Sequence, residues 1–167
     1  PVNERSLPDN MVFTLFRCRD GSIYVGTQNK GLAQWVPGKN EFISYTESSR
    51  FGQVSNTIYD IAEDEHDNLW IASWGGLMSL DRKNNRLAFN DEQNLLTAKK
   101  LYSIHKLHKA DSLFIAGENG PVFFSLKDHS WKPCTKNLME ANNYIGRFIY
   151  EDSNQVLWIC TVGAGLV

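Results

Sequence analysis

The 167-residue sequence lacks any excess of charge of one sign, with 17 Lys and Arg against 19 Asp and Glu. Nucleic acids are bound chiefly by clustered Lys and Arg that neutralise phosphates, and the sequence has no such cluster, so we predict no nucleic-acid partner. It also lacks long hydrophobic runs. The longest, such as residues 12–16 and 113–116, fall far below the roughly 20 residues that span a bilayer. We therefore predict no membrane insertion by this chain.

Cysteine is sparse, and several motifs are missing. Cys18, Cys134 and Cys160 do not occur in a CxxC spacing, which predicts neither a disulfide framework nor a zinc site, and we expect buried free thiols. The glycine-rich nucleotide-binding motifs and the GxSxG nucleophile motif are absent, so we predict no cofactor. The sequence begins at Pro1 without a leader pattern, which indicates a piece of a longer protein.

The sequence does contain a fourfold internal repeat. Four segments share the order aliphatic, aromatic, β-branched, small, small, and they begin 46, 44 and 44 residues apart: residues 23–27, 69–73, 113–117 and 157–161. A glycine follows each segment at nearly the same spacing: Gly31, Gly76, Gly120 and Gly165. A repeat of this length is typical of stacked supersecondary units.

Within each repeat the pattern favours β-strands. The apolar segments are short, rich in β-branched and aromatic residues, and bounded by turn formers such as Asp20-Gly21. Four such strands in about 44 residues are typical of one β-propeller blade. We predict an all-β fold of about 3.5 four-stranded antiparallel blades over residues 1–167, with repeats at approximately 10–55, 56–99, 100–142 and 143–167. An incomplete ring exposes sheet edges, so we expect contacts with remaining blades of the parent chain or a homodimer.

The repeat resembles the two-component-regulator propeller repeat. Residues 63–64 (ED), 68–73 (NLWIAS) and 75–77 (GGL) follow its pattern, and residues 151–152, 157–161 and 163–166 follow it again. The first and third copies diverge, with Arg17-Cys18 and Leu107-His108 at the acidic positions. The resemblance implies the extracytoplasmic, periplasmic sensor region of a Bacteroides-type hybrid two-component system. It also implies a small-molecule or oligosaccharide ligand, and a non-enzymatic segment of a parent that resembles a sensor histidine kinase.

Candidate ligand-binding residues lie in the turns between second and third strands and in the blade-to-blade loops, which line one face of a propeller. An exposed indole there can stack on a sugar ring while amide and charged groups bind hydroxyls. Trp74 interrupts the turn pattern of the other repeats, although a packing role is the alternative. The candidates are Trp74, Gln28, Asn29, Lys30, Glu118, Asn119 and Arg50.

Other chemistry-bearing residues are interpreted as structural. His105 and His108 lie three apart on an expected strand, where alternation places them on opposite faces, so we predict no metal site. The acidic pairs at 63–64 and 151–152 recur at one blade position, which favours turn capping over glycosidase chemistry. Trp70 and Trp158 occupy a core-strand position and are expected to pack.

Two alternatives to the sensor function are compatible with the same sequence. A non-catalytic propeller that only holds protein partners is compatible with the same fold. A propeller glycosidase or lyase is the other alternative, although no single polar cluster breaks the repeat pattern.

Overall fold

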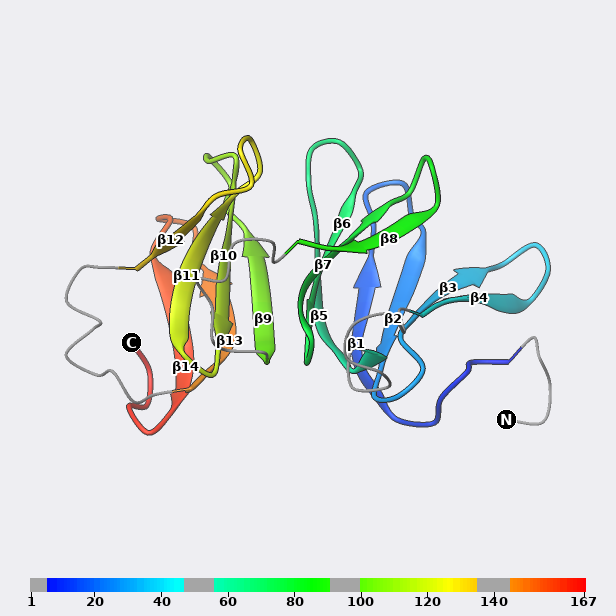
Figure 1. Cartoon of the computed structure of the whole chain (residues 1–167), viewed down its shortest axis with the longest axis horizontal. Coiled ribbons are helices and arrows are strands. Elements are labelled where there is room, and N and C mark those ends of the chain that lie inside the picture. The colour runs from blue at the N-terminus through cyan, green and yellow to red at the C-terminus, as the bar shows by residue number, and fades with distance from the viewer. Residues whose placement is uncertain (1–5, 47–55, 91–99, 135–144) are drawn as a thin grey trace.

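The computed structural model describes residues 6–46, 56–90, 100–134 and 145–167. Fourteen strands in these residues form four antiparallel sheets arranged side by side (Figure 1). Sheet 1 contains β1 (Val12–Arg17), β2 (Ile23–Thr27), β3 (Leu32–Val36) and β4 (Glu41–Tyr45). Sheet 2 contains β5 (Ile58–Glu63), β6 (Leu69–Ser73), β7 (Gly76–Asp81) and β8 (Arg86–Phe89). Sheet 3 contains β9 (Leu101–Lys106), β10 (Ser112–Gly117), β11 (Gly120–Ser125) and β12 (Trp131–Pro133). Sheet 4 contains β13 (Ile145–Glu151) and β14 (Leu157–Val162).

Each sheet is an antiparallel meander whose strands pair in chain order. Three four-stranded sheets and one two-stranded sheet confirm the predicted propeller segment of about 3.5 blades. None of the described residues belongs to a helix that could cross a bilayer.

The core lies between the sheets. Period-two alternation sends successive residues of a strand to opposite faces, and β6 is buried on both. Leu69 and Ile71 pack in a cluster shared with sheet 1, whereas Trp70 and Ala72 pack in a cluster shared with sheet 3. A third cluster joins sheets 3 and 4 through Phe114 and other apolar residues. The repeated motif therefore supplies apolar surface to two interfaces at once.

The first strands β1, β5, β9 and β13 are neighbours, because β5 packs against both β1 and β9, and β9 packs against β13. They form the inner edge of the propeller segment (Figure 1). We call the end of the sheets where these strands begin the N-terminal face, and the end where they finish the C-terminal face.

Two packing predictions from sequence are only partly right. Trp70 is 4% exposed, but Trp158 is 41% exposed, because no described sheet covers the side of β14 on which it lies. Cys18 is a buried thiol, and burial raises its pKa to about 11. Cys160 is exposed, which corrects the expectation of buried thiols.

Candidate functional site

An equivalent β-bulge interrupts the pairing of every first strand with its second strand. The register shifts between Val12 and Thr14 in β1, and between Ile58 and Asp60 in β5. Equivalent shifts occur near the start of β9 and β13. The residues left out of the pairing are Phe13, Tyr59, Tyr102 and Arg147. A bulge redirects the side chain it contains, so the same local irregularity gives four sheets one shared feature.

The four bulge residues lie side by side at the N-terminal face. The Phe13 and Tyr59 rings stack with centroids 5.3 Å apart, and the Tyr59 and Tyr102 rings meet edge to face at 4.9 Å. The guanidinium carbon of Arg147 lies 4.0 Å from the centroid of the Tyr102 ring. We call Phe13, Tyr59, Tyr102 and Arg147 the aromatic row. Phe13 and Arg147 are exposed, and both tyrosines are half-buried.

Hydrogen bonds just beneath the row connect three sheets. Asp60 Oδ2 accepts hydrogen bonds from Ser103 Oγ at 2.9 Å and from the Ile104 amide at 3.0 Å. Ser103 Oγ in turn accepts the Ile149 amide at 3.2 Å. Burial raises the pKa of Asp60, although these hydrogen bonds oppose the shift. The bonds link β5, β9 and β13 immediately beside their bulges, which fixes the spacing of the row.

The turns between second and third strands lie at the same face. The amides of Gln28, Trp74 and Glu118 donate to the carbonyl oxygens of the residues that precede β1, β5 and β9, at 3.0, 3.0 and 3.1 Å. Each turn is thereby tied to the start of its first strand, where the aromatic row begins. The candidates from the turns and the row therefore belong to one surface.

Lys100 contacts two of the predicted residues, Trp74 and Glu118, and so brings them together. Lys100 Nζ lies 4.1 Å from the Trp74 ring centroid and 3.0 Å from Glu118 Oε1. Trp74 is half-buried rather than fully exposed, and Lys100 lies over one face of its ring. The hydrogen bond and ion pair with Glu118 raise the pKa of Lys100. A cation, an anion and an indole thus lie next to one another at this face.

Gln28, Asn29 and Lys30 lie in the turn of sheet 1, and Asn119 lies in the turn of sheet 3. The Gln28 carbonyl accepts a hydrogen bond from the Thr57 hydroxyl, and Gln28 Oε1 is the buried side-chain atom without a hydrogen-bond partner in the described ranges. The Asn29 amide donates to Asp9, and the Lys30 amide donates to Thr27. Arg50 lies outside the described residues.

Sequence reasoning missed the aromatic row, although a signal for it exists. Phe13, Tyr59 and Tyr102 are 46 and 43 residues apart, close to the repeat length. Aligning the repeats would have revealed an aromatic at one position of three first strands. The bulge that turns these side chains toward one another is not visible in the sequence.

The acidic pairs divide into two roles. Asp64 accepts hydrogen bonds from the His66 and Asn68 amides and from Trp70 Nε1, and Asp152 does the same for Asn154, Val156 and Trp158. The second acid of each pair therefore caps its own turn, as predicted.

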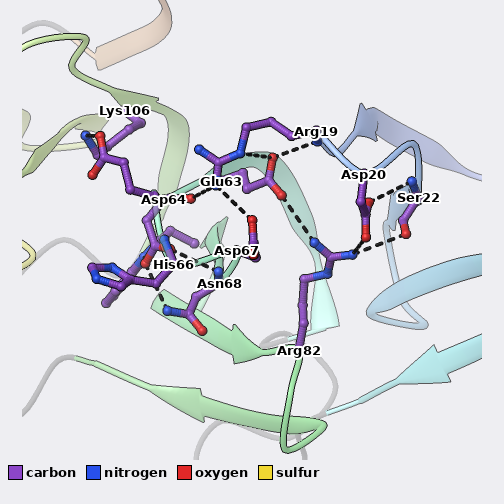
Figure 2. Close-up of polar contacts among 12 residues, drawn as sticks. Arg19, Asp20, Ser22, Glu63, Asp64, His66, Asp67, Asn68, Arg82 and Lys106 are labelled. Atoms are coloured by element: carbon purple, nitrogen blue, oxygen red, sulfur yellow. Dashed lines mark hydrogen bonds and ion pairs between the residues drawn. The ribbon is translucent and has the colours of Figure 1, made fainter.

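The first acid of each pair instead contacts the preceding sheet, which corrects the capping interpretation for Glu63 and Glu151. Glu63 Oε2 accepts the Arg19 amide of sheet 1 at 2.9 Å, and Glu63 Oε1 pairs with Arg82 at 3.2 Å. Figure 2 shows Glu63 between the two arginines, with Arg82 also reaching Asp20. We call this arrangement the arginine joint. Glu151 makes the corresponding contact from sheet 4 to sheet 3.

The prediction that His105 and His108 point apart is wrong. Strand β9 ends at Lys106, so strand alternation does not extend to His108, which lies in the following turn. His105 Nε2 lies 2.9 Å and His108 Nδ1 2.8 Å from Glu151 Oε2. The turn returns the chain so that both imidazoles reach one carboxylate.

Comparison with known proteins bears out the resemblance. The family described as two component regulator propeller matches residues 52–75. Histidine kinase P4 of Formosa agariphila is 34% identical over 76 residues, which are 42% of this chain and 6% of that protein. The match to this family confirms that the repeat at 52–75 is a two-component-regulator propeller repeat.

Two solved structures share the fold. Both are extracellular domains of putative hybrid two component systems from B. thetaiotaomicron. BT3049 has a TM-score of 0.78 at 21% identity over 99% of this chain, and BT4673 has 0.76 at 20% identity over 97%. This chain covers 23% and 21% of their lengths, and thus spans less than a quarter of either structure.

Proposed function

We propose that this chain, which carries two-component-regulator propeller repeats, is part of the extracytoplasmic sensor region of a hybrid two-component system and binds an oligosaccharide at its N-terminal face. Binding is signalled to a histidine kinase in another part of the parent protein. The segment itself is not an enzyme, and in the parent cell it lies in the periplasm. The family match at 52–75, the histidine kinase relative and the two similar extracellular domains support this proposal.

The observation that carries the ligand proposal is the aromatic row. Aromatic ring faces provide apolar contact area for the C–H faces of a sugar, while the phenol groups of Tyr59 and Tyr102 can donate to or accept from hydroxyls. Burial raises the pKa of Tyr59, and the neighbouring Tyr102 raises it further. The phenol of Tyr59 therefore stays protonated at neutral pH. Arg147 adds positive charge at the same face, whereas the charge of Lys100 is paired with that of Glu118. This combination suits a saccharide that carries a carboxylate or sulfate group.

The outer sides of sheets 1 and 4 support a second element of the proposal. Exposed apolar side chains there include Leu15 on β1, and Phe148 and Trp158 on sheet 4. We propose that further blades of the parent chain cover these sides, consistent with the short share of the similar extracellular domains that this chain spans. A homodimer through the same surfaces stays a prediction.

A glycan array followed by calorimetry tests saccharide binding. The chain is expected to bind at least one acidic oligosaccharide, and Tyr102→Ala is expected to weaken that binding about tenfold, because an aromatic contact contributes up to about 1.5 kcal/mol beyond its buried area. Tyr150→Ala is the matched control, since Tyr150 is an exposed tyrosine near the other end of β13. The Tyr150→Ala variant should bind the oligosaccharide with the same affinity as the unmodified chain.

Two results would contradict the proposal. Absence of saccharide binding across the array would favour a propeller that only holds protein partners. Equal binding by the Tyr102→Ala variant and the unmodified chain would exclude the aromatic row as the site.

A further inference from the structure

The joint between sheets 3 and 4 is built on the same plan as the arginine joint but with different side chains. In each joint a glutamate at the end of a first strand accepts a backbone amide from the turn of the preceding sheet: Arg19 to Glu63 at 2.9 Å, and His108 to Glu151 at 3.3 Å. Arginine side chains complete the first joint, and two histidines complete the second. Arginine cannot bind a metal ion as an ordinary ligand, whereas imidazole is the commonest metal ligand of proteins.

The three side chains of the second joint present ligand atoms to one point. The nitrogen and carboxylate ligand atoms of His105, His108 and Glu151 all lie within 4.8 Å of one another. Both histidine nitrogens already contact Glu151 Oε2, at 2.9 and 2.8 Å. Neighbouring ligand atoms of a tetrahedral Zn²⁺ site, with bonds of about 2.0 to 2.1 Å, are separated by about 3.3 to 3.4 Å. Small side-chain rotations would therefore open the present contacts enough to admit an ion.

The surroundings of the three residues suit a partly open cation site. The Glu151 side chain is 5% exposed, those of His105 and His108 are 27% and 68% exposed, so an ion could enter from the solvent side. Burial would raise the pKa of Glu151, but hydrogen bonds from His105 and His108 outweigh it and lower the pKa. Lys106 follows His105 in the chain. Its ammonium forms an ion pair with Glu65 at 2.7 Å and donates hydrogen bonds to two backbone carbonyls.

We propose that His105, His108 and Glu151 bind one divalent transition-metal ion, with Zn²⁺ as the best match, and that the ion ties sheet 3 to sheet 4. Two imidazoles and one carboxylate form a donor set that proteins use for Zn²⁺, with a fourth position left for water. The site lies toward the C-terminal face, at the opposite end of the sheets from the aromatic row. It is independent of the proposed saccharide site.

Zinc titration of the chain tests this site. All variants carry Cys160→Ser, because the exposed Cys160 thiol could itself bind zinc. After treatment with a chelator and its removal, Zn²⁺ is titrated in competition with a chromophoric chelator, and one ion per chain is expected. His108→Ala is expected to lower the affinity at least tenfold, and since His108 is exposed the variant should fold. His66→Ala changes an exposed histidine in the corresponding turn of sheet 2 and should leave the affinity unchanged.

A second readout separates a specific site from a loss of folding. Zn²⁺ is expected to raise the Tm of the chain with both histidines intact and of His66→Ala, because a ligand that binds the folded state stabilises it. It should not raise the Tm of His108→Ala, whose Tm without metal reports whether it folds. The proposal is overturned if the chain does not bind millimolar Zn²⁺. It is also overturned if the His108→Ala variant binds Zn²⁺ and is stabilised by it as much as the chain with both histidines intact.

Discussion

Replacement of Asp64 by alanine is expected to lower the free energy of unfolding by about 3 kcal/mol or more. Asp64 is 3% exposed and accepts hydrogen bonds from two amides, from Asn68 Nδ2 and from Trp70 Nε1. Without the carboxylate, the indole N–H of Trp70 is buried without a partner and the turn between β5 and β6 loses its cap. Urea unfolding followed by tryptophan fluorescence measures the change.

Asp152→Ala is the matched control for this prediction. Asp152 makes three of the four corresponding contacts, to two amides of its own turn and to Trp158 Nε1, but Trp158 is 41% exposed and water can replace the lost acceptor. The loss of stability should therefore be clearly smaller than for Asp64→Ala. Equal losses would show that burial of the tryptophan does not determine the importance of the cap.

The effect of Asp64 should also depend on pH in a defined direction. Burial would raise the pKa of Asp64, but the hydrogen bonds from Trp70, Asn68 and His66 outweigh it and lower the pKa. A carboxylate with a depressed pKa in the folded state stabilises the fold above its unfolded pKa of about 4, and this contribution is lost as pH falls through the folded pKa. The difference in the free energy of unfolding between the unmodified chain and the Asp64→Ala variant should therefore become smaller in acid.

Gly31→Ala is expected to destabilise the chain by about 3 kcal/mol or more, because two costs combine. Gly31 has φ +75°, where an L-residue with a Cβ costs about 1 to 2 kcal/mol. A Cβ at this position would also overlap the carbonyl oxygen of Tyr45, which is backbone and cannot rotate away. Thermal and urea unfolding of the variant measure the combined cost.

Gly21→Ala separates the two costs. Gly21 has φ +87°, but a Cβ there would meet no atom within 4 Å. Its substitution should therefore cost only the conformational part, about 1 to 2 kcal/mol. If Gly31→Ala is no more destabilising than Gly21→Ala, the close approach between the β2–β3 turn and the end of β4 is not as described.

Much of the fold could be predicted because two independent signals in the repeat indicate the strands. The motif at residues 69–73 has its own β pattern, and its recurrence fixes where each sheet begins a new copy. Burial on both faces of β6 then follows from stacking equivalent sheets. The caps formed by Asp64 and Asp152 were predictable for the same reason, because a residue that recurs at a turn has a recurring local role.

The functional surfaces were harder to predict because they depend on departures from regular geometry. The aromatic row exists because a bulge leaves Tyr59 and its equivalents out of the strand pairing, and bulges have no distinct sequence pattern here. His105 and His108 meet because β9 ends before His108, so counting along an ideal strand gave the wrong face. Glu63 accepts the amide of Arg19, 44 residues earlier in the chain and in the preceding sheet's turn, which no local pattern reveals.

A crystal structure of the parent extracytoplasmic region with a bound acidic oligosaccharide tests the central claim most directly. We expect one sugar ring to lie against Tyr59 and Tyr102, with its acidic group near Arg147. A saccharide bound away from the N-terminal face, or a segment of the parent chain packed over the aromatic row, would contradict the proposed function.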